Sequence, residues 1–287
     1  MSQSIHITTL AENSVFRSGL LAEHGLALWI EWNGRRILFD TGQGCVLEHN
    51  ARELQVPFQD ADMIVISHGH FDHTGGLPVA LRRERPVDVF LHPQALAPKY
   101  VQTKNGPARE VGLPEDARRA LASPSARVRL VEHPQVIADG VTLTGPIPRV
   151  VSFEDVGGRF FLDAQCTQPD PLTDDQALVL EADRGSVVLV GCGHAGIIST
   201  LRYVQEITAH RPILAVLGGM HLVNASAKRI EMTIRELRRL KVQCVTFTHC
   251  TGTAAMVALW TAFPRRCEGG HVGSVFSFEG AVNPPLD

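Results

Sequence analysis

Long apolar runs are missing from this sequence. No stretch approaches the roughly 18 consecutive apolar residues that a membrane-spanning helix needs, so we expect no association with a membrane. The first ten residues, MSQSIHITTL, also lack the positively charged and apolar regions of a secretory signal. The sequence therefore predicts a cytoplasmic protein.

An excess of positive charge is missing as well. The chain has 27 Lys and Arg against 30 Asp and Glu, a formal net charge of −3. Because proteins that bind nucleic acid usually present a basic face, we expect no nucleic-acid partner. Hydrophobic residues make up 44% and charged residues 20%, which is the balance of a globular protein rather than of a disordered or fibrous one.

The six cysteines show no C-x-x-C spacing. Without that spacing or a secretory context, disulfides are not expected, and most of the thiols are predicted to be buried. Cys192 and Cys250 differ from the others because each lies beside a histidine in a turn that contains glycine.

The most informative stretch is Ser67 to Gly76, which reads SHGHFDHTGG. His68, His70, Asp72 and His73 place four ligand-type side chains in six positions, directly after the apolar run 63–66. A polar loop that happens to be rich in histidine is the alternative, but with 13 His in 287 residues this density is improbable by chance. A glycine-bearing turn can direct imidazoles and a carboxylate at one point, so the stretch predicts a metal site.

Helices and strands are expected in both halves of the chain. Strands are expected at 5–9, 26–32, 35–39, 63–67, 87–91, 177–181, 187–190, 213–217, 242–247 and 275–278, and helices at 46–54, 77–83, 197–209, 225–240 and up to 263. Asn33-Gly34 predicts a tight hairpin between the second and third strands. The chain is therefore predicted to be an α/β protein.

Several of these strands end in a turn that carries a ligand-type residue. Asp40, His68, Cys192 with His194, His221 and His249 each follow a predicted strand. Side chains at strand ends converge on one edge of a sheet, where open-sheet enzymes bind their ligands. We therefore expect these residues to lie close together.

Between about residues 92 and 175 prolines recur and the predicted strands are short, at 128–131, 141–144 and 159–162. Long loops in a compact domain are often lids or binding loops. We interpret this region as a loop-rich elaboration over the active site of a single domain that spans residues 1–287. Lys99, Tyr100, Lys104 and Arg109 could meet an anionic substrate there, but a solvated charged loop is slightly favoured.

The ordered motifs resemble those of the metallo-β-lactamase superfamily. The matching stretches are LLAEHG (20–25), FDTGQG (39–44), SHGHFDHTGGL (67–77), DDQAL (174–178), VGCGHAGI (190–197), GGMHL (218–222) and THCTG (248–252). More narrowly they resemble a subgroup of metal-dependent hydrolases that includes the dihydropterin-type synthases of methanopterin precursors. The resemblance implies an αβ/βα four-layer sandwich, with two mixed sheets flanked by helices.

The resemblance also implies roles for individual residues. His68, His70 and a later histidine would hold one divalent metal, and Asp72, His73 and His249 a second. Zinc is the favoured metal, with iron, manganese and nickel as alternatives. Asp40 would accept a hydrogen bond from a ligating histidine and set its tautomer. Asp72 and His221 are the candidates for direct participation in catalysis.

One position departs from the family pattern. Most members carry a ligand histidine just before the strand at 177, where this chain reads Pro171-Leu172-Thr173-Asp174-Asp175. Cys192 occupies the place of the bridging Asp, and His194 is the natural substitute imidazole. Packing of the turn is nearly as good an explanation for Cys192. His221 could be a ligand, a donor to substrate or a structural histidine, and His24 and Cys250 are interpreted as structural.

The leading hypothesis is a hydrolase that uses a metal-bound hydroxide on a small, anionic phosphoester or ester. A dihydropterin-type synthase that condenses a pterin with a phosphorylated substrate is the alternative, and a ligand-binding protein without enzymatic activity is the third. The substrate-binding residues and the oligomeric state are not predicted.

Overall fold

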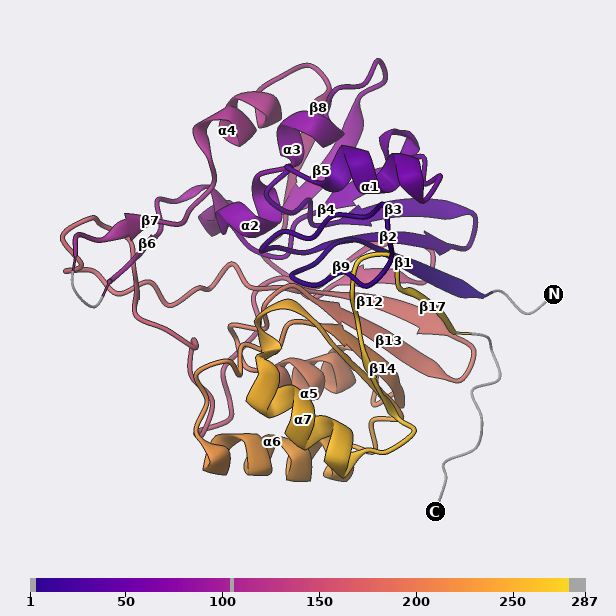
Figure 1. Ribbon diagram of the computed structural model, residues 1–287, viewed down its shortest axis with the longest axis vertical. Coiled ribbons are helices and arrows are strands. Elements are labelled where there is room, and N and C mark those ends of the chain that lie inside the picture. Colours follow the sequence, from indigo (N-terminus) through magenta and orange to yellow (C-terminus); the bar gives the residue numbers. More distant parts are fainter. Residues whose placement is uncertain (1–3, 104–105, 279–287) are drawn as a thin grey trace.

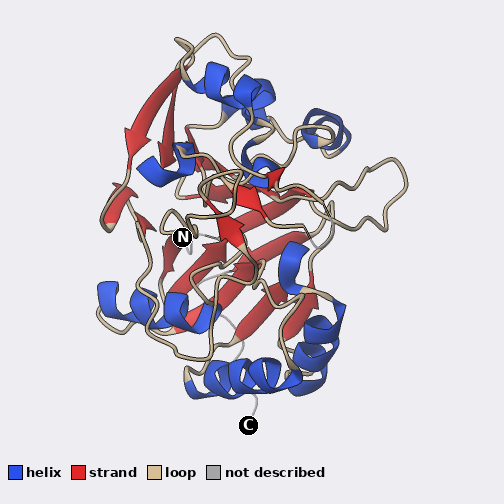
Figure 2. Cartoon of the chain, turned by 90° about the vertical axis from the view of Figure 1, so that its left-hand side faces the viewer, coloured by secondary structure: helices blue, strands red, loops and turns tan. Residues whose placement is uncertain are grey.

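The computed structural model describes residues 4–103 and 106–278. Two seven-stranded sheets form its centre, with order β17-β1-β2-β3-β4-β5-β8 in the first and β16-β15-β14-β13-β12-β10-β9 in the second. Helices cover the outer face of each sheet, so that four layers are stacked (Figures 1 and 2). The predicted αβ/βα sandwich with two mixed sheets is therefore confirmed.

Each sheet has an antiparallel part followed by a parallel part. In the first sheet, β17 (Val275–Phe278), β1 (Ile5–Ala11), β2 (Ala27–Trp32) and β3 (Arg35–Phe39) pair antiparallel, and β4 (Met63–Val65), β5 (Val87–Leu91) and β8 (Ala126–Leu130) continue parallel to β3. In the second, β9 (Gln135–Ala138), β10 (Val141–Leu143), β12 (Ala177–Ala182) and β13 (Gly185–Val190) are antiparallel, and β14 (Ile213–Gly218), β15 (Cys244–Phe247) and β16 (Cys267–Gly269) follow in parallel.

The predicted hairpin at Asn33-Gly34 is present. Trp32 pairs with Arg35, and both turn residues have positive φ, 51° for Asn33 and 68° for Gly34. These are the backbone angles of a type I′ turn, which the Asn-Gly pair favours and which matches the twist of the two strands.

Three apolar clusters hold the layers together. One fills the space between the two sheets and includes Ile30, Phe39, Leu189 and Leu217. The outer face of the first sheet packs on α1 (Leu47–Glu53), α3 (Leu77–Ala80) and α4 (Glu115–Leu121). The outer face of the second packs on α5 (Ile197–Ile207), α6 (Ala227–Arg239) and α7 (Thr253–Ala262). Burial on both faces explains why β13 and β14 are almost entirely apolar.

The proline-rich region 92–175 contains more regular structure than its sequence suggests. It supplies β8, β9 and β10 to the two sheets and also contains α4, which was not predicted. Pro114 lies at the N-cap of α4, where proline precedes a helix without breaking it. A small sheet of β6 (Tyr100–Val101), β7 (Arg109–Glu110) and β11 (Phe160–Phe161) projects from the side of the sandwich (Figure 1).

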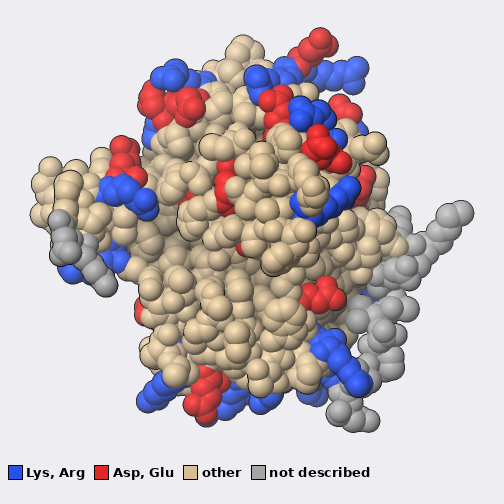
Figure 3. Space-filling model, viewed as in Figure 1, with Lys and Arg blue, Asp and Glu red and all other residues tan. Residues whose placement is uncertain are grey.

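On the face drawn in Figure 3, Lys, Arg, Asp and Glu gather over the outer helices at the two ends. The band between them, over the sheets, is largely uncharged. Among the described residues, no helix is both long and apolar enough to cross a membrane.

Candidate metal centre

The predicted ligand residues meet at the carboxyl ends of the parallel strands. Asp40 follows β3, the histidine loop follows β4, and Cys192, His221 and His249 come after β13, β14 and β15. The short helix α2 (Phe71–Thr74) begins directly after His70 and carries Asp72 and His73 into the same space. The site therefore lies where the strand ends of both sheets come together.

Four groups of possible ligand atoms lie at this edge, and two of them consist of predicted ligands alone and share Cys192. His68, Cys192 and His194 form the first group, and His73, Cys192 and His249 form the second, with all ligand atoms of a group within 4.8 Å of one another. The two groups require residues from both sheets.

Shorter contacts connect the remaining predicted ligands to these groups. His68 Nε2 lies 2.9 Å from His70 Nδ1, and Cys192 Sγ lies 3.2 Å from His73 Nε2. Asp72 Oδ2 is 3.3 Å from His249 Nε2 and 3.8 Å from His73 Nε2. The structure thus brings all seven predicted ligands together.

The unpaired atoms of the site fit a metal ion. Nε2 of His70 and Nε2 of His194 are buried and have no hydrogen-bond partner within the described ranges. A buried polar atom without a partner is costly, so such atoms call for an unseen partner. Imidazole nitrogen, thiolate and carboxylate are also the donors that zinc prefers.

The pKa values of three of the imidazoles support the same fit. Burial lowers the pKa of His68 well below its usual value, lowers that of His70 to about 3, and lowers that of His194 well below its usual value. These rings are therefore neutral near pH 7, which is the form that binds a metal. Burial opposes ionisation of Asp72, but His73, His24 and His249 hold its pKa well below the usual range, so it is a carboxylate.

Asp40 has the orienting contacts that the sequence predicted. Its Oδ1 accepts the Ser67 backbone N–H at 2.7 Å, and its Oδ2 accepts the Ser67 hydroxyl and contacts His73 Nδ1, both at 2.7 Å. With Nδ1 engaged, His73 presents Nε2 to the ligand groups.

Three other imidazoles are held in a comparable way. Val156 O lies 2.8 Å from His194 Nδ1, Asn13 Oδ1 lies 2.9 Å from His249 Nδ1, and Ser67 Oγ lies 2.9 Å from His68 Nδ1. Neither Val156 nor Asn13 is recognisable from the sequence as a partner of these rings. A backbone carbonyl leaves no trace in the side-chain pattern, and Asn13 is 236 residues from its partner.

Three residues of the site have left-handed backbone conformation. Asp40, His221 and His249 have φ of 57°, 42° and 51°. Residues other than glycine rarely adopt such angles, although Asp and His tolerate them better than most. Conformations of this kind concentrate at functional sites, where the surrounding structure maintains them.

Asp174 and Asp175 stand where the resemblance would place a ligand histidine, and they anchor the loops that carry the predicted ligands. Asp174 Oδ2 accepts the Gly69 N–H at 2.8 Å inside the histidine loop, and Asp175 Oδ2 accepts the Ala195 N–H at 2.7 Å beside His194. Burial raises the pKa of Asp175 to about 7.

Lys99 was predicted to lie in a charged loop, either solvated or in contact with substrate, and this is wrong. It is completely buried, and its Nζ lies 2.9 Å from Asp174 Oδ1 and 3.0 Å from Asp170 Oδ2. A buried ammonium requires such paired carboxylates. Lys104 lies outside the described residues, and Arg109 is exposed with its guanidinium over the Phe71 ring.

His24, His221 and Cys250 border the ligand groups. His24 Nε2 lies 3.2 Å from Asp72 Oδ2, so this exposed histidine does lean over the site, although it was interpreted as structural. His221 and Cys250 form a further group with Cys192, and the Cys250 thiol donates to Cys192 O at 3.4 Å. Phe160 covers this side, with its ring 5.0 to 6.1 Å from those of His70, His194 and His221.

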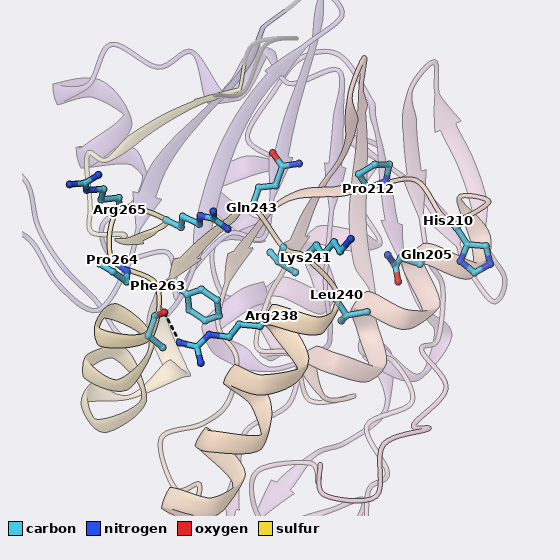
Figure 4. Close-up of a pocket in the computed structure, with 13 residues that line it drawn as sticks. Gln205, His210, Pro212, Arg238, Leu240, Lys241, Gln243, Phe263, Pro264 and Arg265 are labelled. Carbon is cyan, nitrogen blue, oxygen red and sulfur yellow. Dashed lines mark hydrogen bonds between the residues drawn. The ribbon is translucent and has the colours of Figure 1, made fainter. Parts of the chain in front are cut away.

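A larger groove, about 1080 Å³, lies away from these residues (Figure 4). Its lining includes Arg238, Lys241 and Arg265, near the ends of α6 and α7. Cationic side chains at helix carboxyl ends offset the partial negative charge there. Arg238 also donates to Ala262 O at 2.9 Å. We therefore assign the chemistry to the histidine-rich site.

Comparison with known proteins agrees with this geometry. Residues 22–249 match the family model described as the metallo-beta-lactamase superfamily, and the chain belongs to that superfamily. It is 30% identical, over 96% of its own length and 97% of the relative's, to a 7,8-dihydropterin-6-methyl-4-(beta-D-ribofuranosyl)-aminobenzene-5'-phosphate synthase of Methanocaldococcus jannaschii.

A solved structure is similar over almost the whole chain. It is described as a metal-dependent hydrolase of the beta-lactamase superfamily, with 29% identity, a TM-score of 0.82 and coverage of 96% of this chain and 99% of the other. The chain is thus similar both to a protein called a hydrolase and to one called a synthase.

The orienting role of Asp40 can be measured. We expect Asp40→Asn to weaken zinc binding by about 10- to 100-fold, because His73 loses its charged partner. Asparagine tolerates the left-handed backbone of this position, so the fold should be retained. Competition with a chromophoric chelator gives the affinity. Asp60→Asn, at an exposed carboxylate beside Arg36, is the matched control, and equal affinities of the two variants would contradict the assignment.

The buried ion pair of Lys99 predicts a large effect on stability. Lys99→Met leaves the carboxylates of Asp170 and Asp174 buried without a cation, and we expect a loss of about 3–5 kcal/mol in free energy of unfolding. Urea denaturation of metal-free protein measures it. The control is Arg82→Met, whose partner Glu48 is exposed and which should cost at most about 1 kcal/mol. Similar losses for both variants would contradict this account.

The effect of Lys99→Met should also depend on pH. Burial by itself would raise the pKa of Asp174, but Lys99 lowers it. The Asp174 carboxylate therefore stabilises the folded state at pH values above its pKa in the unfolded chain. This contribution is lost as the pH falls through the pKa that Asp174 has in the folded state. In the variant, Asp174 binds a proton at higher pH. The difference in stability between wild type and variant should therefore shrink on acidification from pH 7 towards pH 5, and a difference that grows would exclude this cause.

Proposed function

We propose that the chain is a metal-dependent hydrolase that acts on a small, anionic phosphoester or ester. The observation that supports this best is the pair of ligand groups that share Cys192. Two ions about 3.5–4 Å apart can clamp the oxygens of one substrate, and a shared thiolate between two groups suits such a pair.

In this proposal His68, His70 and His194 would hold one divalent ion, and Asp72, His73 and His249 would hold the second. Cys192 belongs to both ligand groups and could serve either ion, and Asp40 orients His73. Zinc suits the mixed nitrogen, sulfur and oxygen donors, although iron, manganese and nickel remain alternatives. When bound, such an ion acidifies water and polarises a substrate oxygen.

The chain's own residues supply orientation and shielding. Asp72 is ionised and can hold a water molecule at the centre. His221 lies on the Phe160 side of His194, with 4.3 Å between the ring centroids of the two histidines, where it can donate to substrate. Phe160 limits access of water to the rings of His70 and His194.

A dihydropterin-type synthase is the second candidate. The similarity to the synthase of Methanocaldococcus jannaschii over nearly the full length of both chains favours it. The hydrolase and the synthase would both take a small phosphorylated molecule. A binding protein without activity is the third candidate, which the complete ligand set disfavours.

Metal content and hydrolysis test the leading proposal together. Protein purified without chelator or histidine tag should contain about two equivalents of divalent metal per chain by plasma mass spectrometry. It should hydrolyse at least one of four substrate classes, namely phosphodiesters, phosphotriesters, lactones and thioesters. Chelation should abolish this activity and zinc should restore it. Metal-loaded protein that fails on all four classes would refute the hydrolase.

Pterin binding separates the synthase from the hydrolase. Titration of metal-loaded protein with a reduced pterin, followed by fluorescence, should show saturable binding if the chain is a synthase. Hydrolysis without pterin binding would exclude the synthase, whereas saturable pterin binding without hydrolysis would favour it.

A further inference from the structure

A pocket of about 400 Å³ adjoins the metal centre. It is lined by Asp155, Gly157 and Gly158 from the segment before β11, and by His221, Asn224 and Arg229 from the segment after β14 and the start of α6. His221 connects it to the centre, because this residue forms a ligand group with Cys192 and Cys250. His221 is thus shared by the lining of the pocket and the group of possible metal ligands.

Arg229 is the cation of this pocket. It is the third residue of α6, is 8% exposed, and directs Nη1 to Asp155 Oδ1 at 2.5 Å. Its Nε is buried and has no hydrogen-bond partner in the described part of the chain. The guanidinium therefore retains an unused donor, and this group matches the oxygens of a phosphate.

The Asp155 carboxylate occupies the place in the pocket where an anionic ligand would bind. One carboxylate oxygen, Oδ1, receives both Arg229 Nη1 and the backbone N–H of Gly157, the latter at 2.7 Å. A guanidinium and a backbone amide that meet on one oxygen are a typical arrangement for binding phosphate. The carboxylate thus takes the place that an oxygen of an anionic ligand would take.

The two partners of this ion pair are unequally buried. The Asp155 side chain is 68% exposed, whereas that of Arg229 is 9% exposed. Asp155 can move into water at little cost, but Arg229 cannot, because an unpaired buried charge is expensive. An incoming anion can therefore replace the Asp155 carboxylate.

The amino end of α6 adds to this preference. The helix has 13 residues, and its N-cap Ser226 accepts the N–H of Arg229. Asn224, two residues before the cap, also lines the pocket. The partial positive charge at a helix amino end favours an anion nearby.

We propose that this pocket binds a phosphate group of the substrate that does not itself react, with Arg229 as its cationic donor and Asp155 as a built-in competitor. The inference rests on the proposed function, which it narrows to phosphorylated molecules whose reacting bond lies beyond the phosphate. His221 stands between the bound phosphate and the metal ligands and donates to the portion that connects them.

Calorimetric titration with inorganic phosphate at constant ionic strength tests the pocket. It uses metal-loaded wild type, Asp155→Asn, Arg229→Met and, as a matched control, Glu236→Gln, which removes the partner of Arg202 two turns further along α6. Asp155→Asn removes the competing charge and should lower the Kd several-fold. Arg229→Met should raise the Kd roughly tenfold. Glu236→Gln should leave it unchanged.

The Asp155→Asn arm keeps the proposal testable if Arg229→Met does not fold, because Asp155 is exposed. The titrations are repeated after chelation. Binding that survives chelation and follows the variants supports the pocket. Phosphate binding that disappears on chelation and ignores both variants, or an Asp155→Asn variant that binds no more tightly than wild type, would overturn it.

These outcomes are independent of catalysis. If metal-loaded protein hydrolyses none of the four substrate classes but phosphate binding follows the variants, the hydrolase fails and the pocket stands. If hydrolysis is found and phosphate binding ignores both variants, the hydrolase stands and the pocket fails.

Discussion

The carboxylate of Asp40 connects the scaffold of this protein to its histidine loop. It lies fully buried at the end of β3 and bonds to the backbone and side chain of Ser67 and to the ring of His73. A buried carboxylate is stable only when its oxygens are occupied in this way. The same contacts fix the start of the loop after β4 and direct Nε2 of His73 into the centre, so the geometry of the ligands depends on them.

The second sheet uses the same device with different residues. Asp175 holds the turn after β13 through Ala195, and Asp174, paired with Lys99, holds the histidine loop through Gly69. Each carboxylate joins a ligand turn to a segment distant in sequence. Stability and ligand geometry are therefore coupled, because a charge change at these positions affects both the fold and the centre.

The segment from Glu154 to Phe160 gives the centre its outer wall. Glu154 accepts the N–H groups of Ile198 and Ser199 at the start of α5, Val156 O contacts His194, and the Phe160 ring lies 5.0 to 6.1 Å from three histidine rings. Gly157 lies against His221 so closely that any Cβ would overlap the ring. A single segment thus contacts His194, lies against three histidine rings and forms one side of the proposed phosphate pocket. This combination is compatible with a hydrolase and with a synthase.

The sequence by itself determined the fold class, the histidine loop and the strand-end positions of the ligands. These features depend on local spacing: apolar runs define strands, Asn33-Gly34 defines a turn, and four ligand-type residues within six positions predict a metal site. Tertiary structure alone decided that Cys192 belongs to both ligand groups, that Lys99 is buried, and that Asp155 meets Arg229. Each of these depends on residues distant in sequence whose separation is set by the packing of two sheets and their loops, and no local pattern encodes that packing.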